Sequence, residues 1–342
     1  MAFYRNLTPE DRIEDVGVVT SGVFQDGASS ITAFYTSSTQ NTNTGDYSLD
    51  VYRYDPSNNA SASVQFGVAF GHQEGSGSLG TVGATGDRPS AAVFAQFNQL
   101  INPPKTDRFT FGPNTSEKTM YAVTFNRARI REELEPGGWE LHISHSAGKL
   151  LKLIDDSSTF EGGTNNQRNF APEYNIVSGT LVGGTTIKTA AASEDSTMGS
   201  YGVFYPSIGT LLLNPKRLAG ADVSLVTLSG SNSDDRNQKT LFNAIVKGKY
   251  FQAKRQEQIT SRHYFVRATA GQFNSTTNET FYTESVSGIK TIIPGLRSDP
   301  RVYITSVGLY NDSNELLAIA KLSQPILKSK SREALIKVKL DF

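Results

Sequence analysis

Short segments in which apolar and polar residues alternate, or in which Val, Ile, Tyr and Phe run together, recur along the whole chain. Such segments are typical of β-strands, and the Gly, Asn, Asp and Pro residues that bound them are typical of turns. We therefore expect a mainly β fold of antiparallel sheets and β-sandwich units, with a few short helices and long polar loops. The expected strands are residues 13–24, 31–35, 47–54, 61–70, 120–125, 139–143, 202–205, 210–213, 259–268, 302–309, 316–322 and 334–342.

Three segments have a helical pattern instead. Residues 89–100 (PSAAVFAQFNQL) begin with a proline, which suits a first helical turn, and repeat their apolar residues at helical spacing. Residues 126–134 and 239–246 are shorter candidates. We expect these helices to pack on sheet faces or to cross between sheets.

Four polar tracts, rich in Ser, Thr, Asn and Gly, separate the strands at residues 36–45, 73–86, 155–168 and 229–238. Loops of this length are uncommon in compact domains unless they carry function or are disordered. The tracts at 73–86 and 155–168 have few apolar residues to offset the entropy of ordering. We expect both to be mobile in the isolated chain and ordered only in an assembly.

The segment VGLYNDSNELLAIAKL, residues 307–322, consists of two apolar runs around Asn311-Asp-Ser-Asn314. Asn and Asp tolerate the left-handed backbone angles of tight turns, so the segment predicts a β-hairpin. Its second arm has apolar residues on both faces, with Leu316 on one and Leu317 on the other. A strand of this kind is buried on both sides. We expect a second sheet of the same domain to cover it, with a neighbouring subunit as the alternative cover.

The last residues, 334–342, alternate cleanly. Ile336 and Val338 share one face with Leu340 and Phe342, while lysines occupy the other. This pattern predicts a strand with one buried face and one face in water. Because a hairpin alone is only marginally stable, we expect this strand to pair with it and to complete the core of the C-terminal domain.

At 342 residues the chain exceeds the usual size of a single hydrophobic core. We expect N-terminal strands and an extended arm in residues 1–46 and a central mainly β domain with short helices in 47–250. Residues 251–342 are then a C-terminal β-sandwich-like domain. The second boundary is placed there because charge density rises after Tyr250 to Lys254.

Composition excludes several classes of function. The chain has no cysteine, which rules out disulfides, cysteine metal sites and a cysteine nucleophile, and fits assembly in a reducing cytoplasm. Lys plus Arg equals Asp plus Glu at 33 each, so no net field draws the chain to nucleic acid, and we expect no specific nucleic-acid binding. The N-terminus lacks the apolar core of a signal sequence, and no run approaches the roughly 20 apolar residues of a membrane span. We therefore expect no membrane association.

Candidate chemistry is sparse. His142 and His145 are three positions apart in an apparent strand, which places them on opposite faces as poor joint ligands. His72 and His263 are isolated in the sequence and belong to no helical His-Glu-x-x-His arrangement. We interpret His142 and His145 as ordinary surface or interface residues.

The remaining candidates also favour structural interpretations. The glycine-rich GSGSLGTVGATG within 73–86 lacks the Gly-Lys-Ser/Thr ending of a phosphate-binding loop. Asp155-Asp156 and Asp234-Asp235 lack the alternating oxygen ligands of a calcium loop and read as solvated turns. Glu132-Glu133 continues a charged helical segment in which salt links explain the charges. We expect no catalytic, cofactor-binding or metal-binding residues, no cofactor and no enzyme activity.

Several phrases resemble virion structural proteins of T-even-like contractile-tailed phages, particularly those of marine cyanobacteria. The resemblance extends from about residue 47 to the C-terminus. The phrases that carry it are VQFGVAFGHQEGSGS (64–78), PGGWEL (136–141), YNIVSGTL (174–181), YGVFYPSIGTLLLNP (201–215), LFNAI (241–245) and, above all, YITSVGLYNDSNELLAIAKLSQPILKSKSREALIKVKLDF (303–342).

The resemblance implies a non-enzymatic structural component of a bacteriophage virion, assembled in the host cytoplasm. Its partners are then other virion structural proteins, with several copies in a symmetric assembly. A tail or baseplate part is our first expectation. A head decoration or neck protein is one alternative, and a protein that recognises glycans on the host surface is another. Tyr and Phe are spread along strands rather than gathered in loops, which favours a structural part over a glycan-binding one.

Overall fold

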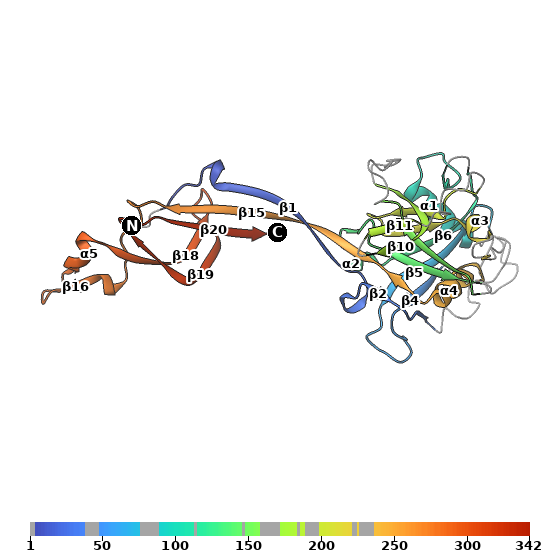
Figure 1. Ribbon diagram of the computed structural model, residues 1–342, viewed down its shortest axis with the longest axis horizontal. Helices are drawn as coiled ribbons and strands as arrows, with labels where there is room; N and C mark the ends of the chain where they lie inside the picture. The colour runs from blue at the N-terminus through green and yellow to red at the C-terminus, as the bar shows by residue number, and fades with distance from the viewer. Residues whose placement is uncertain are drawn as a thin grey trace. The chain divides into compact units, whose positions relative to one another are not determined.

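The computed structural model describes residues 4–37, 48–75, 89–112, 115–145, 148–157, 172–182, 185–188, 198–220, 224–225 and 236–342. It has two compact units (Figure 1). Unit 1 combines Met1–Gly17 with Gln258–Phe342, and unit 2 is Val18–Glu257. The chain is mainly β with antiparallel sheets and short helices, which confirms the expected fold class.

The division into units differs from the three segments expected from the sequence. The first 17 residues belong with the C-terminal segment, and the rest of the expected N-terminal segment belongs to unit 2. The reason lies in the ladder β1–β15–β20, since β1 (Arg12–Gly22) and β15 (Lys254–Ala268) are neighbours in one sheet although they lie far apart in sequence. Such long-range pairing leaves no local signal in the sequence.

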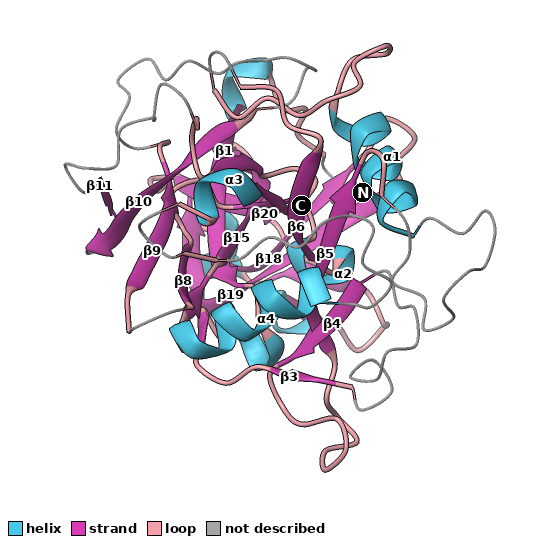
Figure 2. Cartoon of the chain, turned by 90° about the vertical axis from the view of Figure 1, so that its right-hand side faces the viewer, coloured by secondary structure: helices cyan, strands magenta, loops and turns pink. Residues whose placement is uncertain are grey.

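Unit 2 is built on one large antiparallel sheet that interleaves distant parts of the chain (Figure 2). Strand β14 of the sheet, for example, lies between β2 and β8. The order across the sheet is β2 (Ser30–Ile31), β14 (Phe251–Gln252), β8 (Glu140–Ser144), β9 (Leu150–Asp155), β10 (Tyr174–Val182), β12 (Gly202–Tyr205), β13 (Thr210–Leu213), β6 (Thr119–Phe125), β5 (Val64–His72), β4 (Ser48–Tyr52) and β3 (Tyr35–Thr36), with β11 (Thr185–Lys188) beside β10.

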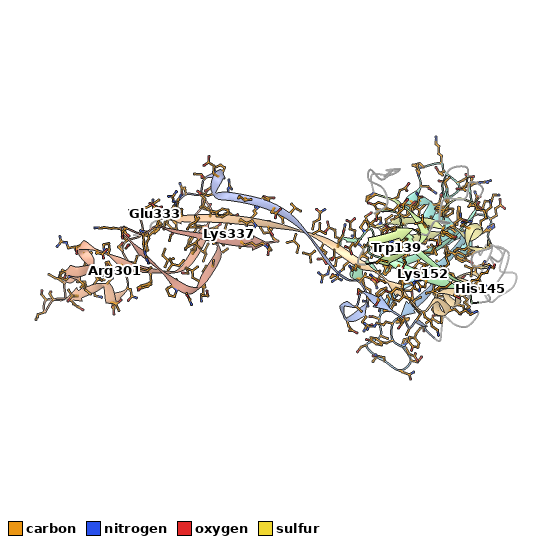
Figure 3. The ribbon with its side chains drawn as sticks, viewed as in Figure 1. Trp139, His145, Lys152, Arg301, Glu333 and Lys337 are labelled. Atoms are coloured by element: carbon orange, nitrogen blue, oxygen red, sulfur yellow. The ribbon has the colours of Figure 1, made fainter. Side chains whose placement is uncertain are left out.

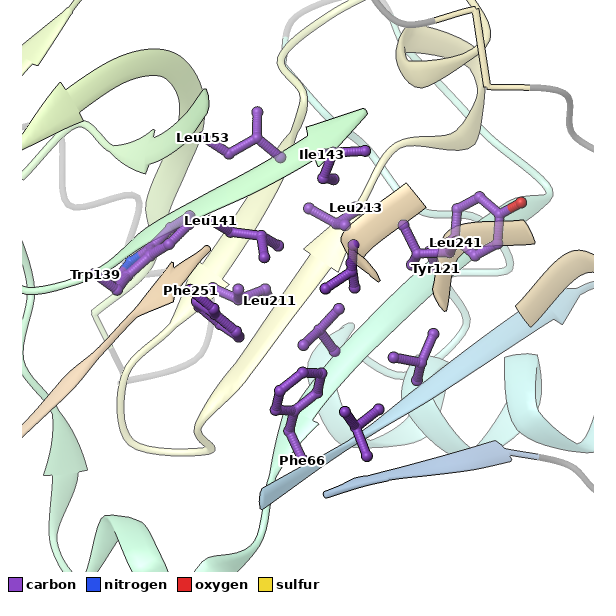
Figure 4. Close-up of a cluster of buried hydrophobic side chains, with 14 of the residues drawn as sticks. Phe66, Tyr121, Trp139, Leu141, Ile143, Leu153, Leu211, Leu213, Leu241 and Phe251 are labelled. Atoms are coloured by element: carbon purple, nitrogen blue, oxygen red, sulfur yellow. The ribbon is translucent and has the colours of Figure 1, made fainter. Parts of the chain in front are cut away.

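Both faces of the central strands are buried, which explains their nearly continuous apolar sequences. On β6, Tyr121 and Val123 point into the larger core, while Met120 and Ala122 point into a second core. Helix α4 (Arg236–Gly248) contributes to the larger core and contacts β8, β5 and β4, and α1 (Pro89–Ile101) covers the second core and contacts β5. Figure 4 shows the larger core, in which side chains from strands across the sheet and from α4 converge.

The helices at 89–100 and 239–246 are confirmed as α1 and α4. The candidate at 126–134 is wrong in its extent, because α2 spans only Arg127–Ile130. The Asn126 side chain caps this helix by accepting a hydrogen bond from the Ala128 N–H, and Arg131 ends it with a φ of 56°. Residues Glu133–Leu134 then form β7, which pairs with the start of β15. Helix α3 (Pro215–Leu218) was not expected.

Unit 1 consists of strand ladders with few helical turns. Strands β18 (Arg301–Tyr310) and β19 (Leu316–Ser329) form a hairpin, which confirms the prediction for this segment. Strand β20 (Ala334–Asp341) pairs with β15. The smaller elements are the ribbon of β16 (Tyr282–Glu284) and β17 (Lys290–Ile292) and the short helix α5 (Pro294–Ser298). Single 3-10 turns are found at Pro9–Asp11 and Glu279–Phe281 in unit 1 and at Gln25–Gly27 in unit 2.

The alternation predicted for the last strand is confirmed over its first part, because Ile336 and Val338 are buried and Lys337 and Lys339 are exposed. It is wrong at the end of the chain, where Leu340 is half-buried and Phe342 is 61% exposed. Its expected pairing with the hairpin is wrong. Strand β20 pairs with β15 over eight residues, from Ser261↔Asp341 to Ala268↔Ala334. This register sets Ile336 opposite Val266, so that the apolar residues of both strands share a face.

The expectation that residues 316–322 are covered on both faces is also wrong for this chain. Leu317 is 67% exposed and Ile319 is 59% exposed. Most residues of the four polar tracts lie outside the described part of the chain, including the glycine-rich segment and Asp234-Asp235. The expected mobility of 73–86 and 155–168 therefore stays a prediction.

Candidate functional site

A carboxylate and an imidazole meet on β8. Glu140 and His142 are two residues apart and so share a face of the strand, and Glu140 Oε1 lies 2.5 Å from His142 Nε2. The other oxygen, Oε2, accepts hydrogen bonds from the Leu181 N–H at 2.6 Å and the Thr180 hydroxyl at 3.0 Å. Because β9 lies between β8 and β10, this buried carboxylate ties together strands that are not neighbours.

Two opposing effects determine the ionisation of Glu140. Burial disfavours the charged carboxylate, but hydrogen bonds from Leu181, His142 and Thr180 outweigh that cost and hold the pKa of Glu140 below its usual value of 4.5. The Tyr250 ring lies 4.7 Å from the His142 ring, and burial, with a smaller effect of Glu140, raises the pKa of Tyr250. The cluster therefore stabilises a charged carboxylate inside the sheet.

The cluster lacks the order of contacts that nucleophilic catalysis needs. A catalytic histidine accepts a proton from a hydroxyl while a carboxylate orients its other ring nitrogen. Here the Thr180 hydroxyl donates to Glu140, and the Tyr250 hydroxyl donates to Gln252 at 2.7 Å. We interpret the cluster as a clamp between strands. The sequence signal for this cluster is the Glu-x-His spacing in a strand, which places Glu140 and His142 on one face. From the sequence we considered only whether His142 and His145 share a face, and so we missed the cluster.

The acidic pair Asp155-Asp156 is not a solvated turn, so that interpretation was wrong. Both residues are buried. Asp155 accepts hydrogen bonds from the N–H groups of Gly137 at 2.8 Å and Ser157 at 3.0 Å, and Asp156 accepts one from the Asn175 N–H at 2.9 Å. Burial raises the pKa of Asp155 despite these bonds. The pair is a local hydrogen-bonding device that joins the ends of β9 and β10 to a turn.

The structure disperses the other candidates. His145 lies just beyond the end of β8, and His263 lies on β15. His72 Nδ1 accepts a hydrogen bond from the Glu74 N–H, and burial lowers the pKa of His72. Glu133 belongs to β7 rather than to a helix and accepts a hydrogen bond from Gln256. In the described part of the chain, no group of three or more His, Cys, Asp or Glu residues is placed to hold a metal ion.

The two units differ sharply in how they bury apolar side chains. Among described residues, unit 1 contributes only six buried apolar side chains: Ala268, Phe281, Val302, Ala334, Ile336 and Val338. Both apolar core clusters belong wholly to unit 2. Of the twenty exposed large apolar side chains in the described ranges, unit 1 nevertheless has fourteen: Tyr4, Ile13, Val16, Val286, Ile289, Ile292, Tyr303, Tyr310, Leu316, Leu317, Ile319, Ile326, Leu335 and Phe342.

Part of this exposed surface is a defined face of the hairpin, which we call the hairpin face: Gly308, Tyr310, Leu316 and Ile319. Gly308 is opposite Ile319, and Tyr310 is opposite Leu316. A Cβ atom on Gly308 would lie 2.9 Å from Tyr310 Cε2 and 3.2 Å from Leu316 Cδ1, so the glycine makes room for both side chains. The Tyr4 ring meets the Tyr310 ring edge-on at 5.1 Å and extends the face.

The outer face of β15 and β20 is different, because charges there are already matched. Arg267 pairs with Glu333 at 2.7 Å, and Lys339 pairs with Asp341 at 3.0 Å. Lys337 lies over the Phe265 ring at 5.9 Å. Figure 3 shows Glu333 and Lys337 in unit 1 and the single tryptophan, Trp139, in unit 2. Charged side chains on this face are therefore paired within the chain, whereas the hairpin face is apolar.

Comparison of the chain with known protein families, with curated proteins and with solved structures finds no match. None of the helices in the described ranges is long and apolar enough to cross a membrane.

Proposed function

We propose that the protein is a non-enzymatic structural component of a bacteriophage virion, and specifically a tail or baseplate part that binds neighbouring virion subunits. Unit 2 is a self-contained β domain, and unit 1 is the attachment module. The observation that carries the proposal is the excess of exposed over buried apolar side chains in unit 1. The resemblance of residues 303–342 to virion structural proteins falls in this same unit.

The energetic reason is a deficit of burial. Ordering the backbone costs about 1–2 kcal/mol per residue, and apolar burial is the main term that offsets it. Six buried apolar side chains are a small core for a unit that includes all of Gln258–Phe342. Large exposed apolar patches mark interaction sites in soluble proteins. In a symmetric particle, repetition multiplies such contacts.

Two alternatives keep some support. A head decoration or neck protein would need the same kind of attachment surface. Recognition of host glycans is favoured by one observation, the exposed rings of Tyr4 and Tyr310 beside Asn311 and Asp312, since aromatic rings with polar neighbours suit sugars. Those rings belong to strand-borne apolar surface rather than to a cleft in loops, so we rank this function second.

Fractionated particles test the proposal directly. Phage that encode this chain with an affinity tag are purified and separated into heads and tails, and the tag is then located by immunoblot and by particle reconstruction. The chain is expected in the tail or baseplate fraction, in several copies. Recovery with heads alone supports the head alternative, and absence from washed particles contradicts a virion role.

Enzyme activity is tested separately on peptidoglycan, lipopolysaccharide and nucleic acid. No turnover is expected. Turnover that survives repurification and disappears in Glu140→Gln or His142→Ala would contradict the non-enzymatic role and would make the β8 cluster an active site.

A further inference from the structure

We propose that two copies of this chain join through the outer edge of β18 and the hairpin face beside it. The inference deepens the proposed function, on which it rests for its biological setting, by naming a second copy of the chain as one partner of unit 1. The edge and the face supply different parts of the interface. The edge supplies backbone hydrogen bonds, and the face supplies apolar area.

In the part of the chain that the structure describes, the outer edge of β18 is unpaired. The hairpin is a two-stranded sheet, so β18 has β19 on one side only. No backbone hydrogen bond within the described ranges joins residues 301–310 to any strand except β19. Residues 302–310 (VYITSVGLY) contain no charged residue and no proline. A long, exposed, uncharged edge strand is a template for pairing with another chain.

The other edges in unit 1 carry the devices that prevent pairing. Strand β19 contains Lys321 and Pro325, and both register shifts of the hairpin place the extra residues on β19 rather than on β18. Strand β20 carries Lys337 and Lys339, and β1 carries several charges around Glu14. Because β1, β19 and β20 carry such devices, β18 is the long strand among them whose edge is left open.

The size of the apolar surface fits a dimer. Tyr310, Leu316 and Ile319 of the hairpin face are 45%, 47% and 59% exposed. Together with the exposed Tyr4 side chain, this surface amounts to on the order of 400 Å² per copy, half of the about 800 Å² that each partner buries in a standard interface. The apolar face and the backbone hydrogen bonds of the edge therefore suit a weak, reversible dimer.

A second copy is the partner that this strand fits. Antiparallel pairing of β18 with β18 around a two-fold axis sets residues 302–310 of one copy against the same residues of the other, and because this stretch has no charged residue no like charges meet within it. The same pairing through β20 would bring lysines of both copies together. The product is a four-stranded sheet in the order β19–β18–β18–β19, which removes the marginal stability of an isolated hairpin.

Sedimentation velocity of the full chain over a range of micromolar concentrations tests the inference. A reversible dimer is expected. Ser306→Lys, at an exposed position of β18, should weaken association at least about tenfold, equivalent to about 1.4 kcal/mol. Leu100→Lys changes a residue of unit 2 that is 57% exposed and is the matched control, which should leave the dimer intact.

Hydrogen exchange supplies a readout that does not depend on a variant. Those amides in residues 302–310 that point away from β19 should be protected at dimer concentrations and exposed on dilution. A wild-type chain that stays monomeric, or a dimer that persists in both Ser306→Lys and Ile319→Lys, overturns the inference. A monomer found in phage tails would leave the proposed function standing, whereas a β18 dimer absent from washed particles would leave only the inference standing.

Discussion

Units 1 and 2 have similar local sequence patterns but opposite relations between strand and core. In unit 2, apolar residues on both faces of β6 are covered, by the larger core on one side and by α1 with its core on the other. In unit 1, the arm of β19 that is apolar on both faces leaves Leu317 and Ile319 exposed. The same pattern therefore marks a covered central strand in one unit and an exposed strand in the other.

The comparison teaches that apolar patterning alone does not predict which strands the chain itself covers. A strand that is apolar on both faces predicts burial, but it does not say whether the cover belongs to the same chain. If the two units unfold independently, a change in one unit should leave the stability of the other unchanged. Trp139, the only tryptophan, is buried in unit 2 and reports on that unit alone.

The largest effect is expected from deletion of residues 335–342. The deletion removes Ile336 and Val338, two of the six buried apolar side chains of unit 1, and leaves β15 without its eight-residue partner. Unit 1 should lose protection against hydrogen exchange throughout 258–334 and the chain should tend to aggregate, while the thermal transition of Trp139 fluorescence stays unchanged. A soluble truncated chain with unchanged protection in unit 1 would show that β20 is not part of its core.

A substitution in the core of unit 2 should have the next largest effect. Phe66 is fully buried, with its ring 5.2 Å from that of Phe251 and 5.8 Å from that of Phe125. Phe66→Ala should lower the free energy of unfolding by about 3–5 kcal/mol, measured by Trp139 fluorescence in urea. Tyr303→Ala, at a position in unit 1 that is 64% exposed, is the control and should leave the same transition within about 0.5 kcal/mol. Equal losses in both variants would contradict the separation of the units.

The sequence predicts strands well because each depends on its own composition. Residues 119–125 and 202–205 are apolar and rich in β-branched or aromatic side chains, and both form strands. The partner of a strand is a different matter. The alternation in 334–342 predicts which side chains are buried, but nothing in it distinguishes β15 from the hairpin as the neighbour.

The sequence also missed contacts that depend on the arrangement of strands. Glu140 reaches Thr180 and Leu181 across β9, and no spacing rule relates residues forty positions apart in this way. The buried positions of Asp155 and Asp156 were missed for the same reason, since the N–H groups that hold Asp156 come from Asn175 on β10. The exposed apolar face of the hairpin was visible as a pattern, but its exposure depends on what the rest of the chain fails to cover.

A smaller loss of stability is expected from substitution of Lys328, a fully buried lysine of unit 1. Its Nζ donates hydrogen bonds to the Ala270 carbonyl at 3.1 Å, the Asn274 side-chain oxygen at 3.0 Å and the Ser329 carbonyl at 2.8 Å. Lys328→Met keeps most of the volume but leaves these acceptors unpaired, which should cost about 2–3 kcal/mol. Hydrogen exchange in residues 268–276 should rise, with Lys330→Met at an exposed position as the control. Unchanged exchange in Lys328→Met would show that the ammonium is dispensable.

The smallest effect is a pH-dependent one in unit 2. The pKa of Glu140 is held below its usual 4.5 in the folded protein, so its carboxylate stabilises the fold fully above that value and loses this contribution as the pH falls through the lower, folded pKa. Glu140→Gln keeps the shape of the side chain but removes the negative charge of the carboxylate. This carboxylate accepts a hydrogen bond from the Leu181 N–H and lies beside the His142 ring. The variant should be less stable by about 1–3 kcal/mol at neutral pH.

The sign of the pH dependence separates this role from simple loss of a hydrogen bond. The difference between wild type and Glu140→Gln, followed by Trp139 fluorescence in urea, should be constant from neutral pH down to about 4.5 and should shrink below it. Asp155, whose pKa is raised by burial, contributes the opposite slope, but it is present in both proteins and cancels in the difference. A difference in stability that does not change with pH would mean that the contribution of Glu140 does not depend on its ionisation. The clamp across β9 would then rest on hydrogen bonds alone and not on a buried charge.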